Sequence, residues 1–400
     1  MFSKKTRSTT ALLFSSLLLT IGRGATLPFM AIYLSREYQL PVDDIGIAMS
    51  IALTTGIFFS LGFGMLADKF EKKRYMLLSI ITFIFGFAAI PMVHSTVLVV
   101  IFFSVINCSY LVFSTVLKAY FSETLSVSAK PKIFSLNYTF INMGWTVGPP
   151  IGTLLLMYGT QLPFWLAAIS ASVPLFMIQL FVQRSKAINA GEENSVKWDP
   201  KIMLKDRALS WFVLSTFFGT LTFGSFASCI SQYILVVYDA KLAESVIAVV
   251  LPVNAAIVVS LQYIVGKHVT AERLRKLMTL GTLFFMVGLL GFMFAGNNLI
   301  FWALAIAVFT LGELIYAPGE YMMIDNIAPL GMKASYFSAQ SLGWLGAALN
   351  PLASGFILTS FPPVSLFAIL MVICGLAWFC MIQGMNVSQK RAMALYFVVD

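Results

Sequence analysis

Residues 64–76 read GMLADKFEKKRYM, a short group of opposite charges between two long apolar runs. Asp68 opens the group, and Lys69, Lys72 and Lys73 follow it closely. Charged side chains are costly inside a lipid bilayer, so such a group is typical of a loop between two membrane-spanning segments. The stretch therefore predicts where the chain leaves the bilayer and where it returns.

The composition of the chain indicates its class. Hydrophobic residues make up 59% of the 400 residues and charged residues only 11%, whereas about 25% of the residues of a soluble domain are charged. Continuous apolar runs of about 20 residues, enough to cross a hydrocarbon core of roughly 30 Å, recur along the chain. We therefore predict an all-α integral membrane protein in a lipid bilayer, with twelve helices at 11–34, 44–66, 75–92, 96–120, 133–158, 162–183, 208–234, 246–265, 276–295, 299–322, 336–359 and 363–385.

The positions of the 26 Lys and Arg residues orient these predicted helices. If the N-terminus is cytoplasmic, almost all of them fall in cytoplasmic segments, and the outer loops hold only Arg36 and Lys241. This asymmetry follows the positive-inside rule. We therefore expect both termini in the cytoplasm, and we interpret the net charge of +9 as a record of topology. It does not indicate nucleic-acid binding.

The two halves of the chain resemble each other. Gly64 corresponds to Gly266 and Ser135 to Ser338, at a displacement of about 200 residues. Such a duplication is typical of transporters that alternate access by rocking two bundles about a site at the midplane. We expect an N-terminal six-helix bundle, a cytoplasmic linker and a C-terminal six-helix bundle with a short tail, at 1–183, 184–207 and 208–400.

The charged loop also carries a family pattern. Residues Gly64 to Lys73 follow G-x-L-A-D-[K/R]-x-x-[K/R]-[K/R], with Glu71 where a second glycine is common, and the chain resembles the major facilitator superfamily. The resemblance implies two pseudo-symmetric six-helix bundles and a gating role for Asp68, Lys72 and Lys73. We expect Asp68 to meet the positive N-terminal end of a helix in the other bundle. A charge cluster that only sets topology is the alternative.

A second motif, GWTVGPPIG at residues 144–152, matches in part the pattern G-x-x-x-G-P-x-x-G of drug:proton antiporters in this superfamily. Glycines four residues apart share a helical face and allow a neighbouring helix to come close, while an internal proline bends the helix. The residues that carry the match are Gly144, Gly148, Pro149 and Gly152. The resemblance implies proton-coupled export, and helix packing without a role in antiport is the alternative.

Two longer stretches resemble a branch of efflux transporters of enteric bacteria. They are LLLTIGRGATLPFMAIYLSR at 17–36 and GEYMMIDNIAPLGMKASYFSAQSLGWLGAALNP at 319–351. The resemblance to this branch implies export of dipeptides or drugs.

Four ionisable residues that lie within predicted helices are functional candidates: Arg23, Lys118, Glu313 and Glu320. Lys118 and Glu320 have nearly equivalent positions in the repeat and opposite charges, which predicts a gating ion pair between the bundles. A Lys118 side chain that only reaches toward the membrane interface is the alternative.

Glu313 is the expected proton carrier. Burial favours a neutral carboxyl group, whereas water or a nearby cation favours the ionised one, so alternating access can load and unload a proton. Arg23 is expected to act as that cation or to bind a substrate carboxylate. A purely structural role for either residue is the alternative. The expected substrate cavity contains Arg23, Tyr33, Asn107, Gln232, Tyr316 and Glu313.

Other kinds of chemistry lack a motif. The sequence has no Walker A glycine loop, no catalytic motif and no His or Cys spacing typical of a metal site, so we expect no enzymatic activity, no cofactor and no metal. The expected function is proton-driven export of a small-molecule substrate such as a dipeptide or drug across a bacterial inner membrane, by a monomer. A facilitator or importer without proton coupling, and a membrane receptor with the same fold, are the alternatives.

Overall fold

The computed structural model describes residues 4–184 and 198–399, and these residues form α-helices and short 3₁₀ helices without any strand. Most of the linker predicted at 184–207 lies outside the described residues. Its last part forms a short helix, α8, Pro200–Lys205. Asp206 follows α8 and caps the next helix by accepting the backbone N–H groups of Ala208 and Leu209.

Contacts divide the chain into two compact units. Unit 1 consists of Met1–Trp198 and Pro329–Ser338, and unit 2 consists of Asp199–Ala328 and Ala339–Asp400. The main boundary therefore falls within the predicted linker. The segment Pro329–Ser338 comes from the second half of the sequence but packs with unit 1.

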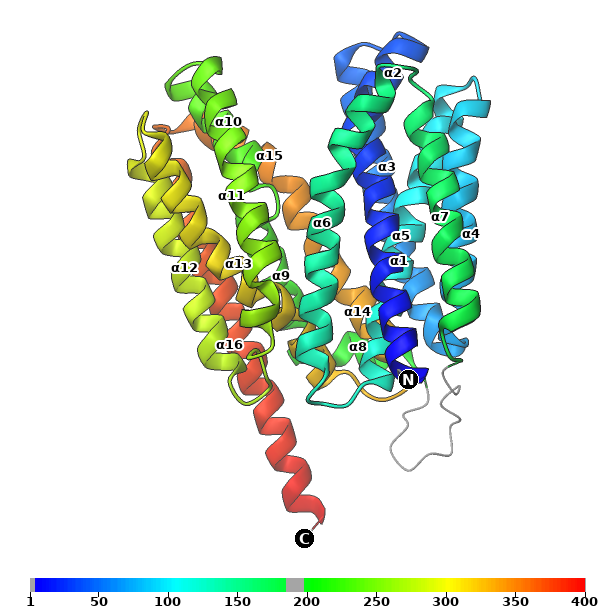
Figure 1. Ribbon diagram of the computed structural model, residues 1–400. Helices are drawn as coiled ribbons and strands as arrows, with labels where there is room; N and C mark the ends of the chain where they lie inside the picture. The colour runs from blue at the N-terminus through cyan, green and yellow to red at the C-terminus, as the bar shows by residue number, and fades with distance from the viewer. Residues whose placement is uncertain (1–3, 185–197, 400) are drawn as a thin grey trace. The chain divides into compact units, whose positions relative to one another are not determined.

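Between Lys4 and Phe181, unit 1 contains seven α-helices and three 3₁₀ helices. They are α1 (Lys4–Thr26), η1 (Leu27–Phe29), α2 (Met30–Tyr38), α3 (Val42–Leu66), η2 (Ala67–Lys69), α4 (Lys72–Ala89), η3 (Ile90–Met92), α5 (Thr96–Thr124), α6 (Lys130–Leu156) and α7 (Leu162–Phe181) (Figure 1). Pro28 lies in η1, where it has no backbone N–H for an α-helical hydrogen bond. The first span therefore changes helix type between α1 and α2.

The rest of the chain is also helical. After α8 come α9 (Arg207–Phe223), α10 (Phe226–Val237), α11 (Ala240–Gly266), α12 (Leu274–Phe294), α13 (Leu299–Ile327), α14 (Lys333–Ser341), η4 (Leu342–Trp344), α15 (Leu345–Ser360) and α16 (Ser365–Val399). The first residues of α14 pack with unit 1, and the other helices belong to unit 2.

The helix pairings of unit 1 recur in unit 2. In unit 1, α1 packs on α6 and α7, α5 packs on α3 and α4, and α4 packs on α7. In unit 2, α9 packs on α15 and α16, α13 packs on α11 and α12, and α12 packs on α16. The two units thus share one internal arrangement, as expected from the repeat in the sequence.

Ten helical segments in the described part of the chain are long and apolar enough to cross a membrane. The pair α9 and α10, bent by 43° at its break, brings the number to eleven. The remaining predicted span, 133–158, coincides largely with α6. This helix is not among the segments apolar enough to count as a span, and it contains Asn137, Asn142 and two internal prolines.

Candidate functional site

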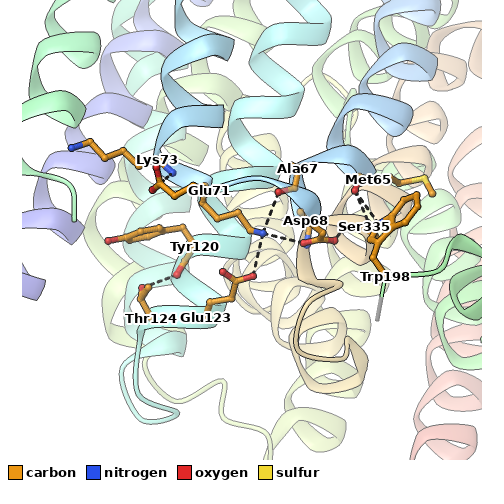
Figure 2. Close-up of polar contacts among 12 residues, drawn as sticks. Met65, Ala67, Asp68, Glu71, Lys73, Tyr120, Glu123, Thr124, Trp198 and Ser335 are labelled. Carbon is orange, nitrogen blue, oxygen red and sulfur yellow. Dashed lines mark hydrogen bonds and ion pairs between the residues drawn. The ribbon is translucent and has the colours of Figure 1, made fainter. Parts of the chain in front are cut away.

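A buried charge cluster joins three helical segments of unit 1. Lys72, at the start of α4, places its Nζ 3.2 Å from Asp68 Oδ1 and 3.4 Å from Glu123 Oε1 (Figure 2). The side chains of Lys72, Asp68 and Glu123 are 5%, 0% and 7% exposed. Lys72 Nζ also donates to the carbonyl oxygen of Ala67 at 3.3 Å. One buried cation therefore bridges two carboxylates, a burial that is costly unless the charges are well paired.

Asp68 also binds the first turn of α14. Its Oδ1 accepts the backbone N–H of Ala334 at 2.9 Å, and its Oδ2 accepts that of Ser335 at 2.7 Å. The N-terminal turn of a helix has unpaired N–H groups and a partial positive charge, so a carboxylate at this end is favourable. We expected Asp68 to meet the N-terminal end of a helix in the other bundle; α14 comes from the second half of the sequence, but the residues that Asp68 binds pack with unit 1.

Trp198 lies beside the charge cluster and binds Ser335, and the sequence did not predict this position. The indole N–H group lies 3.2 Å from the carbonyl oxygen of Met65 and 3.1 Å from Ser335 Oγ (Figure 2). Lys69 Nζ lies 3.8 Å from the centroid of the indole ring, in cation–π geometry. A single tryptophan in a polar linker was the only available signal for this role.

The other gating candidates are separate from this cluster. Lys73 Nζ donates to the carbonyl oxygen of Gln179 at the end of α7, at 2.8 Å. Lys118 is buried in α5 and Glu320 is buried in α13. Lys118 belongs to unit 1 and Glu320 to unit 2, so their ion pair stays a prediction.

Arg23 lies within the first span, in the last turn of α1. Its Nη2 donates to Asn107 Oδ1 at 2.9 Å, and its guanidinium carbon lies 4.0 Å from the centroid of the Tyr110 ring. Asn107 Nδ2 donates to the carbonyl oxygen of Leu53 at 3.0 Å, which fixes the direction of the amide. Trp145 presents a second ring, 5.9 Å away. The cation is thus held by an amide and aromatic faces, and no ion pair of Arg23 occurs in the described part of the chain.

The antiporter-type motif forms a close contact between α6 and α1. A Cβ atom on Gly144 would lie 2.6 Å from Thr20 Cβ, and one on Gly148 would lie 2.7 Å from Gly24 Cα. A Cβ atom on Gly152 would overlap the carbonyl oxygen of Ala25. Pro149 lies inside α6 between these contacts. The three glycines therefore set the distance between α6 and the helix that carries Arg23, as expected for small residues at a helix interface.

Glu313 is buried in α13 of unit 2. Asn254 on α11 donates from Nδ2 to Glu313 Oε2 at 2.8 Å and lies 3.0 Å from Thr310 Oγ1. The Thr310 hydroxyl donates to the carbonyl oxygen of Ile306 at 2.7 Å. The amide of Asn254 therefore links α11 to the face of α13 that carries Thr310 and Glu313, the predicted proton carrier.

The remaining cavity candidates occupy different surroundings. The Tyr33 hydroxyl donates to the carbonyl oxygen of Ile90 at 3.2 Å. The Tyr316 hydroxyl lies 3.3 Å from Ser215 Oγ, and its ring packs against Phe285. Gln232 lies on α10, and its buried Oε1 has no hydrogen-bond partner in the part of the chain described here. Their contact with substrate stays a prediction.

The sequence pattern of a protein family covers most of the chain. The model of the family described as "Major Facilitator Superfamily" matches residues 12–345. The chain belongs to the Major Facilitator Superfamily. It is 62% identical over 380 residues to the uncharacterized MFS-type transporter YdeE of Escherichia coli (strain K12), and the alignment covers 95% of this chain and 96% of that one. This similarity agrees with the predicted resemblance to an enteric branch.

One more distant relative of this chain is named as an antiporter. The chain is 23% identical to the Na(+), Li(+), K(+)/H(+) antiporter of Planococcus maritimus, with 82% of this chain and 84% of that one covered. The crystal structure of the human organic anion transporter MFSD10 has the same fold, with a TM-score of 0.75, 15% identity and coverage of 95% of this chain and 100% of that one. The protein is therefore a multi-pass membrane transporter with the major facilitator fold, and not an enzyme.

Proposed function

We propose that the protein is a proton-coupled antiporter that exports small organic solutes, such as dipeptides or drugs, by alternating access. The observation that carries the proposal is the buried carboxyl group of Glu313, held by the Asn254 amide at 2.8 Å. A carboxyl group in such surroundings can exchange a proton when its access to water changes. The relative in Planococcus maritimus, named as an antiporter of metal cations and protons, supports proton exchange in this family.

Arg23 is the second member of the proposed coupling pair. Its guanidinium group is oriented by Asn107 and Tyr110, and it offers further N–H donors to a substrate. A dipeptide carries both a carboxylate and an ammonium group, so it can use Arg23 and Glu313 in turn. We assign the substrate cavity to both residues, with Tyr33, Asn107, Gln232 and Tyr316.

The charge cluster serves in this proposal as a gate. Asp68, paired with Lys72, holds the first turn of α14, and release of this turn accompanies the change of access. Lys73 and the Lys118–Glu320 pair assist the same step. The proton gradient is the energy source, and no cofactor takes part. We place the monomer in the bacterial inner membrane with both termini in the cytoplasm.

The test uses proteoliposomes that contain a pH-sensitive dye and carry a proton gradient. Alanylalanine or tetraphenylphosphonium is added on the side opposite the protons, and proton movement across the membrane is recorded. The wild-type protein should move protons only when a substrate is present, whereas Glu313→Gln should not. Glu272→Gln makes the same chemical change at an exposed position and should behave as wild type.

Three other outcomes of this proteoliposome experiment would change the proposed function in different ways. Proton movement that persists in Glu313→Gln would assign the carrier to another residue. Radiolabelled alanylalanine that exchanges across the membrane without proton movement would favour the facilitator. The absence of both exchange and proton movement with these two probes would contradict export of this class of solute.

A further inference from the structure

A crevice opens on unit 1 between α3 and α4. Helix α5 packs against both of these helices and forms the floor of the crevice, whose volume is about 550 Å³. This volume lies within the range of roughly 300 to 1,000 Å³ that is usual for small-molecule sites. Arg23 and the charge cluster do not line the crevice. It is therefore a feature distinct from the proposed transport site.

The length of the crevice matches one leaflet of a bilayer. Helix α3 lines it with Ile51, Thr55, Phe59 and Phe63, which follow one another at successive turns. At about 1.5 Å per residue, Ile51 and Phe63 are separated by about 18 Å along the helix axis. One leaflet contributes about 15 Å to a hydrocarbon core of roughly 30 Å. All three helices belong to predicted membrane spans, so the crevice follows the direction of a lipid chain.

The hydroxyl groups in the walls of the crevice form hydrogen bonds with other groups of the protein. The surface that faces the crevice is therefore apolar. Thr55 Oγ1 donates to Ser104 Oγ at 2.9 Å, and Thr82 Oγ1 lies 2.8 Å from Ser109 Oγ. Ser79 Oγ donates to the carbonyl oxygen of Tyr75 at 2.9 Å. These hydroxyl groups already have hydrogen-bond partners in the protein, so they do not require a polar ligand. The occupant of this crevice is therefore expected to be a hydrocarbon.

Tyr75 joins the two walls at one end of the crevice, and the cation Arg74 lies one helical turn from its lining. The Tyr75 hydroxyl donates to the carbonyl oxygen of Phe63 at 2.7 Å and joins α4 to α3 there. Arg74 lies one turn before Leu78 on the same face of α4, and Leu78 lines the crevice. The Arg74 side chain is 72% exposed, and its Nε lies 3.8 Å from Glu71 Oε2.

The other cations of this loop are engaged elsewhere. Lys69 stacks on Trp198, Lys72 is buried between two carboxylates, and Lys73 donates to the Gln179 carbonyl oxygen. Arg74 has a long contact with Glu71 but keeps a side chain that is 72% exposed, so it is the cation of residues 69–74 that is best placed to meet a negative group at the end of the crevice.

We propose that this crevice binds one acyl chain of an anionic membrane phospholipid, with the phosphate group at Arg74. The apolar walls accept the chain, the length of the crevice fits one leaflet, and the exposed guanidinium group complements the negative headgroup. This lipid site does not depend on the proposed transport activity.

The test is native mass spectrometry of the purified full-length protein in detergent, with dioleoylphosphatidylglycerol or dioleoylphosphatidylethanolamine added. The wild-type protein should retain one phospholipid and should prefer the anionic one. Val105→Phe places a ring in the crevice and should abolish retention of both lipids. Val173→Phe makes the same change at a 50% exposed position on α7, outside the crevice, and should retain lipid as the wild type does.

The headgroup contact has its own pair of variants. Arg74→Gln should reduce the preference for the anionic lipid about fivefold, since one cation near the lipid surface has an effect of about this size. Lys132→Gln removes a different exposed cation and should leave the preference unchanged. Because Arg74 is exposed, this comparison remains informative even if Val105→Phe fails to fold.

Several results would overturn the lipid site. Equal retention by Val105→Phe and the wild type would place the lipid elsewhere, and an unchanged preference in Arg74→Gln would remove the headgroup contact. Displacement of the lipid by equimolar tetraphenylphosphonium would identify the crevice as a lateral entrance for substrate. A dimer that dissociates in Val105→Phe but not in Val173→Phe would identify it as an interface between two copies.

Discussion

The backbone N–H of Ser335 donates to Asp68 Oδ2 at 2.7 Å, across a sequence separation of 267 residues. The same carboxylate accepts the N–H of Ala334 and pairs with Lys72. A single side chain therefore caps α14 and neutralises a buried cation. The loop that indicates the membrane class in the sequence is also an anchoring point of the tertiary structure.

Asp68→Asn should weaken this anchor while preserving the shape of the side chain. The amide oxygen can replace only one acceptor, and the attraction to Lys72 and to the end of α14 is lost. We expect the free energy of unfolding to fall by about 1–3 kcal/mol, measured by thermal unfolding in detergent. Asp44→Asn, at an exposed position, is the control. Equal stability of Asp68→Asn and the wild type would contradict the capping role.

Lys72→Met should be more damaging than a change of either carboxylate, because it leaves Asp68 and Glu123 buried without their shared cation. Loss of one partner from a buried ion pair costs about 3–5 kcal/mol. In the double variant Lys72→Met/Glu123→Gln, part of the lost stability should return, because Glu123→Gln removes one of the two buried negative charges that lack a cation. A double-mutant cycle of unfolding free energies measures the coupling, and simple additivity would argue against a three-residue cluster.

Trp198→Phe should separate the indole hydrogen bonds from the ring contact. Phenylalanine keeps a face for Lys69 but cannot donate to Met65 or Ser335. We expect a loss of about 1 kcal/mol in the free energy of unfolding and an altered export rate in proteoliposomes. The matched control is Trp378→Phe, which removes an indole hydrogen bond to Thr279 at 3.0 Å. If both variants change the export rate equally, Trp198 has no specific role in the gate.

Gly148→Ala should disrupt the contact between α6 and α1. The new methyl group would lie 2.7 Å from Gly24 Cα, which belongs to the backbone and cannot rotate away. Overpacking of this kind costs about 1–3 kcal/mol. Gly62→Ala is the control, because nothing lies within 4 Å of its added Cβ. Thermal unfolding should show a loss for Gly148→Ala only, and tolerance of alanine at both positions would contradict the close approach.

Arg23→Gln should affect substrates according to their charge. The variant lacks the guanidinium group that Asn107 orients, so the KM for alanylalanine should rise about tenfold or more. The KM for tetraphenylphosphonium, which has no carboxylate, should stay close to the wild-type value. Arg36→Gln is the control for loss of an exposed cation on the same span. Equal effects on both substrates would indicate a structural role for Arg23.

Much of the architecture could be predicted from local features. The apolar runs predicted the membrane class, and the loop at Gly64–Lys73 predicted the superfamily, which the family match confirms. The predicted span at 133–158 corresponds to α6, yet this helix is not among the segments that are apolar enough to cross a membrane by composition. Glycine spacing in α6 predicted a packing face, but not that α1 occupies it.

The sequence by itself determined the membrane class, the helical segments and the positions of the charged groups, because hydropathy and charge are properties of neighbouring residues in the chain, over about 20 residues for one span. Only the tertiary structure decided that Asp68 caps α14, that Trp198 binds Ser335 in the same helix, and that α3 and α4 leave a crevice above α5. Such contacts depend on how distant segments pack. That packing is set by the shapes of all the side chains together, and no local pattern records it.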